Sequence, residues 1–153
     1  MNVLARDPFT GIQIRIGVMG SAGGDVPPEV AERCRRLGRA IAEHGCCLLT
    51  GACPGVPHDV VLAAKKAGGH VVGGRSGTLG EFAIAYEQGK LIGVLTDTGG
   101  ITTALPALEA TLNKQTGSEV MYETDPDVLV ERLLARYTSG GYKCACYPRS
   151  ADA

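Results

Sequence analysis

The sequence predicts a single α/β domain with a parallel sheet of about five strands and helices on both faces. Short apolar runs alternate with segments of helical periodicity between Ile12 and Tyr137, and this alternation is typical of a parallel sheet with crossover helices. Glycine-rich loops follow four of the apolar runs, after Met19, Thr50, Val72 and Leu95. In parallel sheets such loops meet at the carboxyl ends of the strands, where ligands bind.

The first half of the chain predicts two strand–loop–helix units after a loose lead-in over residues 1–11. Ile12–Met19 is apolar enough for a buried central strand, and a helix begins at Pro27-Pro28 and ends before Gly45. Residues 46–50 then form a second strand and residues 59–67 a short helix, which Gly68-Gly69 ends.

The second half predicts three more units. The expected strands are residues 71–73, 91–95 and 119–122. One helix is expected after Thr78, a second from Thr102 or Pro106 to about Lys114, and a third from Asp125-Pro126 to Tyr137. Leu79, Phe82, Ala83 and Tyr86 are expected to form the inner stripe of the first of these helices. Residues 142–153 are expected to be a polar tail, and one domain is expected to span residues 1–153.

The strand order is predicted from the position of the loop that follows strand 71–73. This loop must reach the first loop if the two share a pocket, which favours a central place beside strand 12–19. Right-handed crossovers then lead to the order 2-1-3-4-5.

The candidate site centres on His70–Glu81, where an apolar strand breaks into a glycine loop and then begins a helix. Loop amides and a helix N-terminus, which carries about half a positive charge, bind anions well. The candidate phosphate-binding residues of this stretch are Gly73, Gly74, Arg75, Ser76, Gly77 and Thr78, joined from the first two loops by Gly20, Ser21, Gly51 and Gly55. Glu81 lies one turn into the helix and is the candidate catalytic residue; favourable interaction with the helix dipole is its alternative role.

Composition excludes several classes of protein. A net charge of -1 lacks the basic footprint of a nucleic-acid binder, and no apolar run approaches the length of a membrane span. A soluble cytoplasmic protein is therefore expected. Cys34, Cys46 and Cys47 occupy apolar positions typical of buried thiols, and Cys144 and Cys146 lack a second ligand pair. No metal site is predicted.

The pattern Gly77-Thr78-Leu79-Gly80-Glu81 resembles the G-T-x-x-E segment of the LONELY GUY family, which includes the molybdenum-cofactor carrier proteins. Gly17–Ser21 and Leu49–Gly55 resemble the first two phosphate loops of this family. The resemblance covers most of residues 12–137. It implies a Rossmann-like homodimer that requires no cofactor and binds a nucleotide-type ligand or molybdopterin. Several members hydrolyse nucleoside 5′-monophosphates, whereas the carrier branch is not catalytic.

Two departures from the family pattern bear on activity. The family loop reads P-G-G-x-G-T-x-x-E. This chain has Gly73 at the position of the proline and Arg75 at the position of the second glycine. In addition, Gly69-His70 runs directly into Val71-Val72, where family members carry a further segment with a catalytic arginine. The chain resembles two family pieces joined near His70-Val71, either through an internal deletion or because a segment is omitted. The sequence therefore favours a binding protein, with a pterin carrier and a phosphoribohydrolase that uses Glu81 as alternatives.

Overall fold

The computed structural model describes residues 3–8, 10–21, 23, 25–51, 53–73, 78–112, 116–140 and 142. Within them the chain forms five α-helices and five strands, and all strand pairs in the named sheets are parallel. This confirms the α/β fold class. The chain divides into two compact units, Met1–Thr78 and Leu79–Ala153, which are described separately. The single domain over residues 1–153 stays a prediction.

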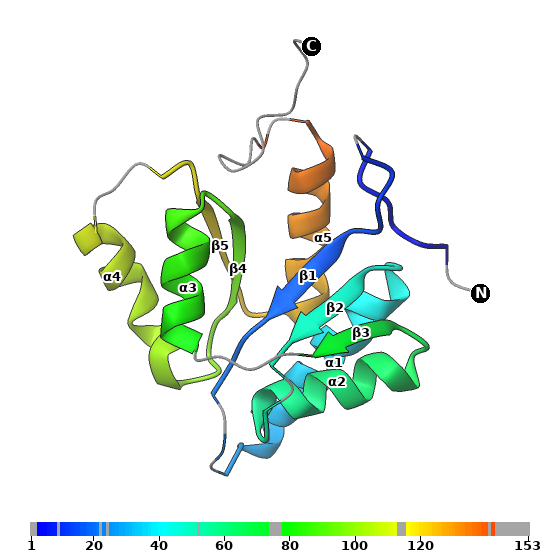
Figure 1. Ribbon diagram of the computed structural model, residues 1–153. Helices are drawn as coiled ribbons and strands as arrows, with labels where there is room; N and C mark the ends of the chain where they lie inside the picture. The colour runs from blue at the N-terminus through cyan, green and yellow to red at the C-terminus, as the bar shows by residue number, and fades with distance from the viewer. Residues whose placement is uncertain are drawn as a thin grey trace. The chain divides into compact units, whose positions relative to one another are not determined.

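Unit 1 is a three-stranded parallel sheet with two helices. In chain order its elements are β1 (Arg15–Val18), α1 (Pro28–Glu43), β2 (Cys47–Thr50), α2 (Val56–Lys66) and β3 (His70–Gly73). Figure 1 shows α1 and α2 together beside the strands. The two helices approach so closely that a Cβ atom on Gly38 would lie 2.2 Å from the carbonyl oxygen of Val60. Fully buried Ile41, Leu48 and Val60 fill the core of this unit.

The order of the strands in unit 1 corrects the sequence prediction. β2 lies between β1 and β3, with Leu48 opposite Ile16 on one side and Val71 on the other, so the predicted contact between the first and third strands is wrong. The packing of the two helices agrees with the observed order. α2 lies directly on α1, with Gly38 against Val60, and the turn after α2 packs on α1 as well, where a Cβ on Gly69 would lie 2.6 Å from the Cβ of Ala42. Two successive right-handed crossovers to neighbouring strands place both helices on one face of the sheet, whereas the predicted order would place them on opposite faces.

The N-terminal segment is bonded to the body of unit 1, which the sequence did not predict. The amide of Ala5 donates to the carbonyl of Gly45 at 3.1 Å, and the amide of Ile14 donates to the carbonyl of Ala5 at 2.9 Å. Arg6 and Gln13 form an antiparallel bridge. Residues 5–7 therefore lie between the end of α1 and the approach to β1.

Unit 2 contains a two-stranded parallel sheet between helices. Its elements are α3 (Thr78–Glu87, which begins at the last residue of unit 1), β4 (Leu91–Leu95), the 3₁₀ helix η1 (Gly100–Thr103), α4 (Leu105–Leu112), β5 (Glu119–Glu123) and α5 (Pro126–Thr138). Ile92 and Val94 on β4 pack with Phe82, Tyr86 and Leu105. Gly93 faces the other way, toward Leu129 and Leu133 of α5, and α5 accordingly lies opposite α3 and α4 in Figure 1.

Two side-chain expectations for unit 2 need correction. α3 buries Phe82 and Tyr86, but Leu79 and Ala83 of the predicted inner stripe are exposed. Apolar residues surround this helix, so periodicity alone does not select its inner face. Tyr142, the first residue of the predicted polar tail, is 2% exposed and its hydroxyl donates to the carbonyl of Gly89. Cys144 and Cys146 lie outside the described residues.

Candidate functional site

The three strands of unit 1 end in one row, and this row is the base of the candidate site. Val18 pairs with Thr50, and Thr50 pairs with Gly73, so the carboxyl ends of β1, β2 and β3 are level. Gly20 and Ser21 follow β1 within a few residues, Gly51 follows β2 directly, and Gly73 ends β3. The predicted binding residues of all three strand ends in unit 1 therefore lie at the same edge of the sheet.

The loops after β1 and β2 contact each other. The amide of Gly23 donates to the carbonyl of Pro54 at 2.7 Å. Gly55 has a φ of +102°, and a Cβ there would lie 2.9 Å from the carbonyl oxygen of Ser21. A Cβ on Gly20 would lie 2.8 Å from Cγ1 of Val56. The structure thus brings Gly20, Ser21 and Gly55 together, and packing between the loops already requires both glycines. Their contact with a ligand stays a prediction.

α2 directs its N-terminus toward this edge. The helix begins at Val56, immediately after Gly55, and its N-cap makes no side-chain hydrogen bond. The partial positive charge of the helix end is therefore close to the interlocked loops. Thr50 is a buried hydroxyl at the end of β2, and Cys53 is half-buried in the following loop, its thiol 3.7 Å from the carbonyl of Gly51. The sequence reasoning missed Thr50, although a polar residue that ends an apolar strand is a usable signal.

The remaining predicted residues are less well placed. Gly74, Arg75, Ser76 and Gly77 lie outside the described residues. The backbone of Gly73 belongs to β3 and that of Thr78 to the first turn of α3. Glu81 is half-buried in the first turn of α3, in unit 2. Its catalytic role and its position relative to the loops of unit 1 stay predictions.

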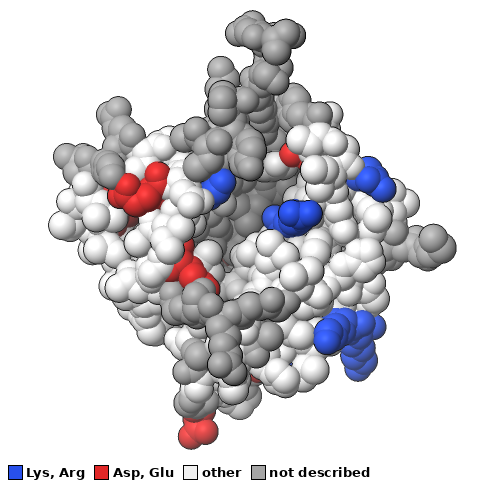
Figure 2. Space-filling model, in the orientation of Figure 1, with Lys and Arg blue, Asp and Glu red and all other residues white. Residues whose placement is uncertain are grey.

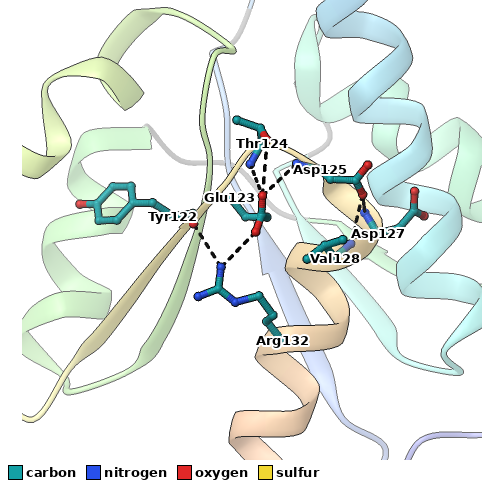
Figure 3. Close-up of polar contacts among 7 residues, drawn as sticks. All are labelled: Tyr122, Glu123, Thr124, Asp125, Asp127, Val128 and Arg132. Carbon is teal, nitrogen blue, oxygen red and sulfur yellow. Dashed lines mark hydrogen bonds and ion pairs between the residues drawn. The ribbon is translucent and has the colours of Figure 1, made fainter.

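Unit 2 contains a carboxylate cluster at the carboxyl end of β5 that the sequence analysis did not identify (Figure 3). The Glu123 carboxylate accepts hydrogen bonds from the amide of Thr124 at 2.8 Å and from Nη1 of Arg132 at 3.0 Å. Asp125 caps α5, because its Oδ1 accepts from the amides of Asp127 and Val128 at 2.9 and 3.1 Å. The Asp-Pro cap was predictable; the preceding glutamate carried no separate signal.

Hydrogen bonding lowers the pKa of Glu123 below its usual value, first through the amides of Thr124 and Asp125 and then through Arg132. A carboxylate with a depressed folded-state pKa stabilises the fold above its ordinary pKa, and this contribution disappears as the pH falls through the folded-state value. We therefore expect Glu123→Gln to weaken the acid dependence of stability, measured by urea unfolding across the acid range.

Glu131→Gln removes an exposed carboxylate from α5, the helix that carries Arg132, and is the control. An acid dependence in Glu123→Gln as steep as in the unmodified chain would contradict the assignment of Glu123.

The other described residues include no candidate reactive thiol among Cys34 and Cys46, and no candidate metal site. Burial raises the pKa of Cys34 and of Cys46 to about 11, so both thiols stay protonated near neutral pH. No group of three or more His, Cys, Asp or Glu side chains among the described residues could hold a metal ion. Figure 2 shows small, separate acidic and basic groups on a mostly uncharged face. No helix in the described part of the chain is long and apolar enough to cross a membrane.

Comparison with known proteins identifies the family. The model of the SLOG cluster4 family matches residues 13–74 and residues 71–130, which together make up most of the chain. The chain belongs to the SLOG cluster4 family. The resemblance to LONELY GUY proteins, near the carrier branch, is thereby confirmed. No curated protein sequence matches the chain significantly.

Solved structures support the Rossmann-like fold of this SLOG cluster4 protein. The Moco carrier protein from Chlamydomonas reinhardtii is 26% identical with a TM-score of 0.63, over 80% of this chain and 98% of that one. A second structure of a Chlamydomonas reinhardtii carrier is 25% identical with a TM-score of 0.52 and the same coverage. TM1055, a structural-genomics target, is 19% identical with a TM-score of 0.60 over 80% of this chain and 97% of its own, which supports the fold alone.

The family match also includes the junction near His70-Val71 of this SLOG cluster4 protein. The two matched segments overlap at residues 71–74, the stretch at which the sequence resembles two joined family pieces. The boundary between the compact units, at Thr78 and Leu79, lies a few residues further on.

Proposed function

We propose that this SLOG cluster4 protein binds a phosphorylated, nucleotide-type small molecule at the loops after its parallel strands. The observation that supports this proposal is made at the edge of unit 1, where the loops after β1 and β2 contact each other beside the N-terminus of α2. Backbone amides and a helix end suit a phosphate group, because they supply hydrogen-bond donors and partial positive charge without a metal.

The scarcity of charged residues in these loops limits the kind of ligand that suits them. Residues 19–27 and 51–57 contain no Lys or Arg, and Asp25 is their only charged residue. Unit 1 would therefore hold its ligand mainly through amides and hydroxyls such as that of Ser21, while Arg75 is the cation that the adjoining loop can add. A ligand with one phosphate attached to an uncharged body suits this edge better than a polyphosphate.

A pterin-cofactor carrier without catalytic activity is the second candidate. The Chlamydomonas reinhardtii Moco carrier protein, at 26% identity and a TM-score of 0.63, supports it. Molybdopterin also joins a phosphate to a heterocycle, so the same loops suit both kinds of ligand. We further propose that the protein is a cytoplasmic homodimer, as the family resemblance implies.

Thermal unfolding tests the binding proposal. A ligand that binds only the folded state at 100 times its Kd stabilises it by about 2.7 kcal/mol, so AMP or a pterin ligand should raise the Tm measurably. Ser21→Asp places a negative charge on the loop after β1 and should abolish the rise. Ala107→Asp, at an exposed position of α4 in unit 2, is the charge-matched control and should retain it.

The same panel separates the candidates. A larger rise with the pterin ligand favours the carrier, and a larger rise with AMP favours the nucleotide-binding protein. Free adenine released from AMP, and lost in Glu81→Gln, would establish a phosphoribohydrolase instead. No rise with any phosphorylated ligand would refute binding at these loops.

A further inference from the structure

Two helices begin at the loop edge of unit 1, and they differ in the hydrogen-bond donors that they offer. α1 follows the loop after β1, and α2 follows the loop after β2. Pro27 at the N-cap of α1 and Pro28 at its first position have no amide hydrogen, so α1 lacks two of the donors that the start of a helix usually offers. Gly55 and Val56 at the same positions of α2 keep their amide hydrogens. The start of α2 is therefore the better donor for an anion.

The charges at the two helix starts differ in the same sense. Asp25 lies two residues before Pro27, and Glu29 occupies the first turn of α1. Neither carboxylate has an ion pair or hydrogen bond with another described residue. The first turn of α2 contains one carboxylate, that of Asp59, which lies 3.9 Å from Nη1 of Arg35. The negative charge at α1 is thus larger and offsets its helix dipole, so a phosphate binds more favourably at α2.

Asp25 is close to the contact between the two loops. The amide of Gly23 donates to the carbonyl of Pro54 at 2.7 Å, and a Cβ on Gly55 would lie 3.0 Å from the nitrogen of Gly23. Asp25 follows Gly23 by two residues, so their Cα atoms are at most about 7.6 Å apart. An ionised carboxylate only accepts hydrogen bonds. The part of a ligand that lies against Asp25 must therefore carry donors, such as hydroxyl groups, rather than a second phosphate.

We propose that Asp25 orients the nucleotide-type ligand and excludes a second phosphate. The phosphate of the ligand lies at the start of α2, and its sugar hydroxyls lie toward the start of α1, where they donate to the Asp25 carboxylate. An acidic side chain is a common partner of ribose hydroxyls in proteins with parallel sheets. A further phosphate in place of a sugar hydroxyl brings like charges together and weakens binding. The inference rests on the proposed function and names its ligand class, a ribonucleoside monophosphate with free sugar hydroxyls.

Isothermal titration with AMP and with adenosine 3′,5′-bisphosphate tests this selectivity, because the two ligands differ only in the second phosphate. The unmodified chain should bind AMP about tenfold or more tightly than the bisphosphate. A phosphate and a carboxylate a few ångströms apart at a protein surface repel each other by at least the energy of such a change in Kd. Asp25→Asn should remove most of the difference between the two ligands. Asp25→Lys should make the bisphosphate the tighter ligand.

Glu43→Gln is the control, since it removes an exposed carboxylate from the opposite end of α1 and should leave the ratio of the two affinities unchanged. The Tm of each ligand-free variant shows whether it is folded. Equal affinities in the unmodified chain, or a ratio that neither Asp25 variant changes, would overturn the role of Asp25 while AMP binding still supports the proposed function. A Tm rise with the pterin ligand alone would also overturn it. No rise with any phosphorylated ligand would remove the proposed function as well.

Discussion

Gly38→Ala is expected to destabilise the protein by roughly 2–4 kcal/mol. The added Cβ would lie 2.2 Å from the carbonyl oxygen of Val60, and 3.1 Å from its Cα. Both atoms belong to the backbone of α2, so no side-chain rotation relieves the clash and the helices must separate. That separation disturbs the packing of a helix whose buried side chains include Cys34 and Ile41. Urea unfolding, followed by circular dichroism, measures the loss.

Whether Gly38→Ala lowers or raises the free energy of unfolding tests the close packing of α1 against α2. Replacing glycine by alanine inside a helix ordinarily stabilises by about 0.5–1 kcal/mol, because glycine loses more backbone entropy on folding. Gly80→Ala, in the first turn of α3 with open space around the added Cβ, is the control and should show a gain rather than a loss. A gain at Gly38 as well would mean that α1 and α2 do not pack this closely.

Gly38 illustrates how much of the fold could be predicted from the sequence. The bounds of α1, which begins at Pro28 and ends before Gly45, and the burial of Cys34 depend only on neighbours along the chain, and the sequence predicts them. Local patterns also located the five strands and the Asp125-Pro126 start of α5, whereas α2 begins at Val56 and not at the predicted residue 59. The close approach of α1 to α2 at Gly38 depends on residues more than twenty positions apart, and no local pattern records it.

The strand order failed for a related reason. β3 was placed by the requirement that its loop share a pocket with the loop after β1. Instead, α2 and the turn at Gly69 pack on α1, and β3 pairs with β2. Choosing between these positions requires knowing which face of the sheet α2 covers, which apolar periodicity does not encode.

The candidate site was predictable in composition but not in geometry. Glycine-rich loops at strand ends were visible in the sequence, and those after β1 and β2 do meet. The sequence did not show that Gly20 and Gly55 are required by packing against Val56 and Ser21. Loop glycines satisfy close packing and ligand approach by the same absence of a side chain, so only binding experiments can separate the two roles.

Leu48→Ala is expected to cost about 3 kcal/mol, within the usual range for a leucine truncated in a core. Leu48 is fully buried because β2 is the middle strand of its sheet, with Ile16 and Val71 on either side and helices packed over it. With neighbours on every side, the surroundings cannot collapse into the space that the lost methyl groups leave. Urea unfolding of the variant measures this cost directly.

Leu49→Ala provides the control, since it removes the same atoms from the next residue of β2, which is half-buried on the opposite face of the sheet. We expect a cost of about 1 kcal/mol there, because less apolar surface is lost from the interior. Amide hydrogen exchange adds a test of the topology itself. In this sheet β2 is hydrogen-bonded along both edges, so the amides of β2 should exchange more slowly than those of β3. Equal costs at Leu48 and Leu49, with slower exchange in β3 than in β2, would contradict the central position of β2.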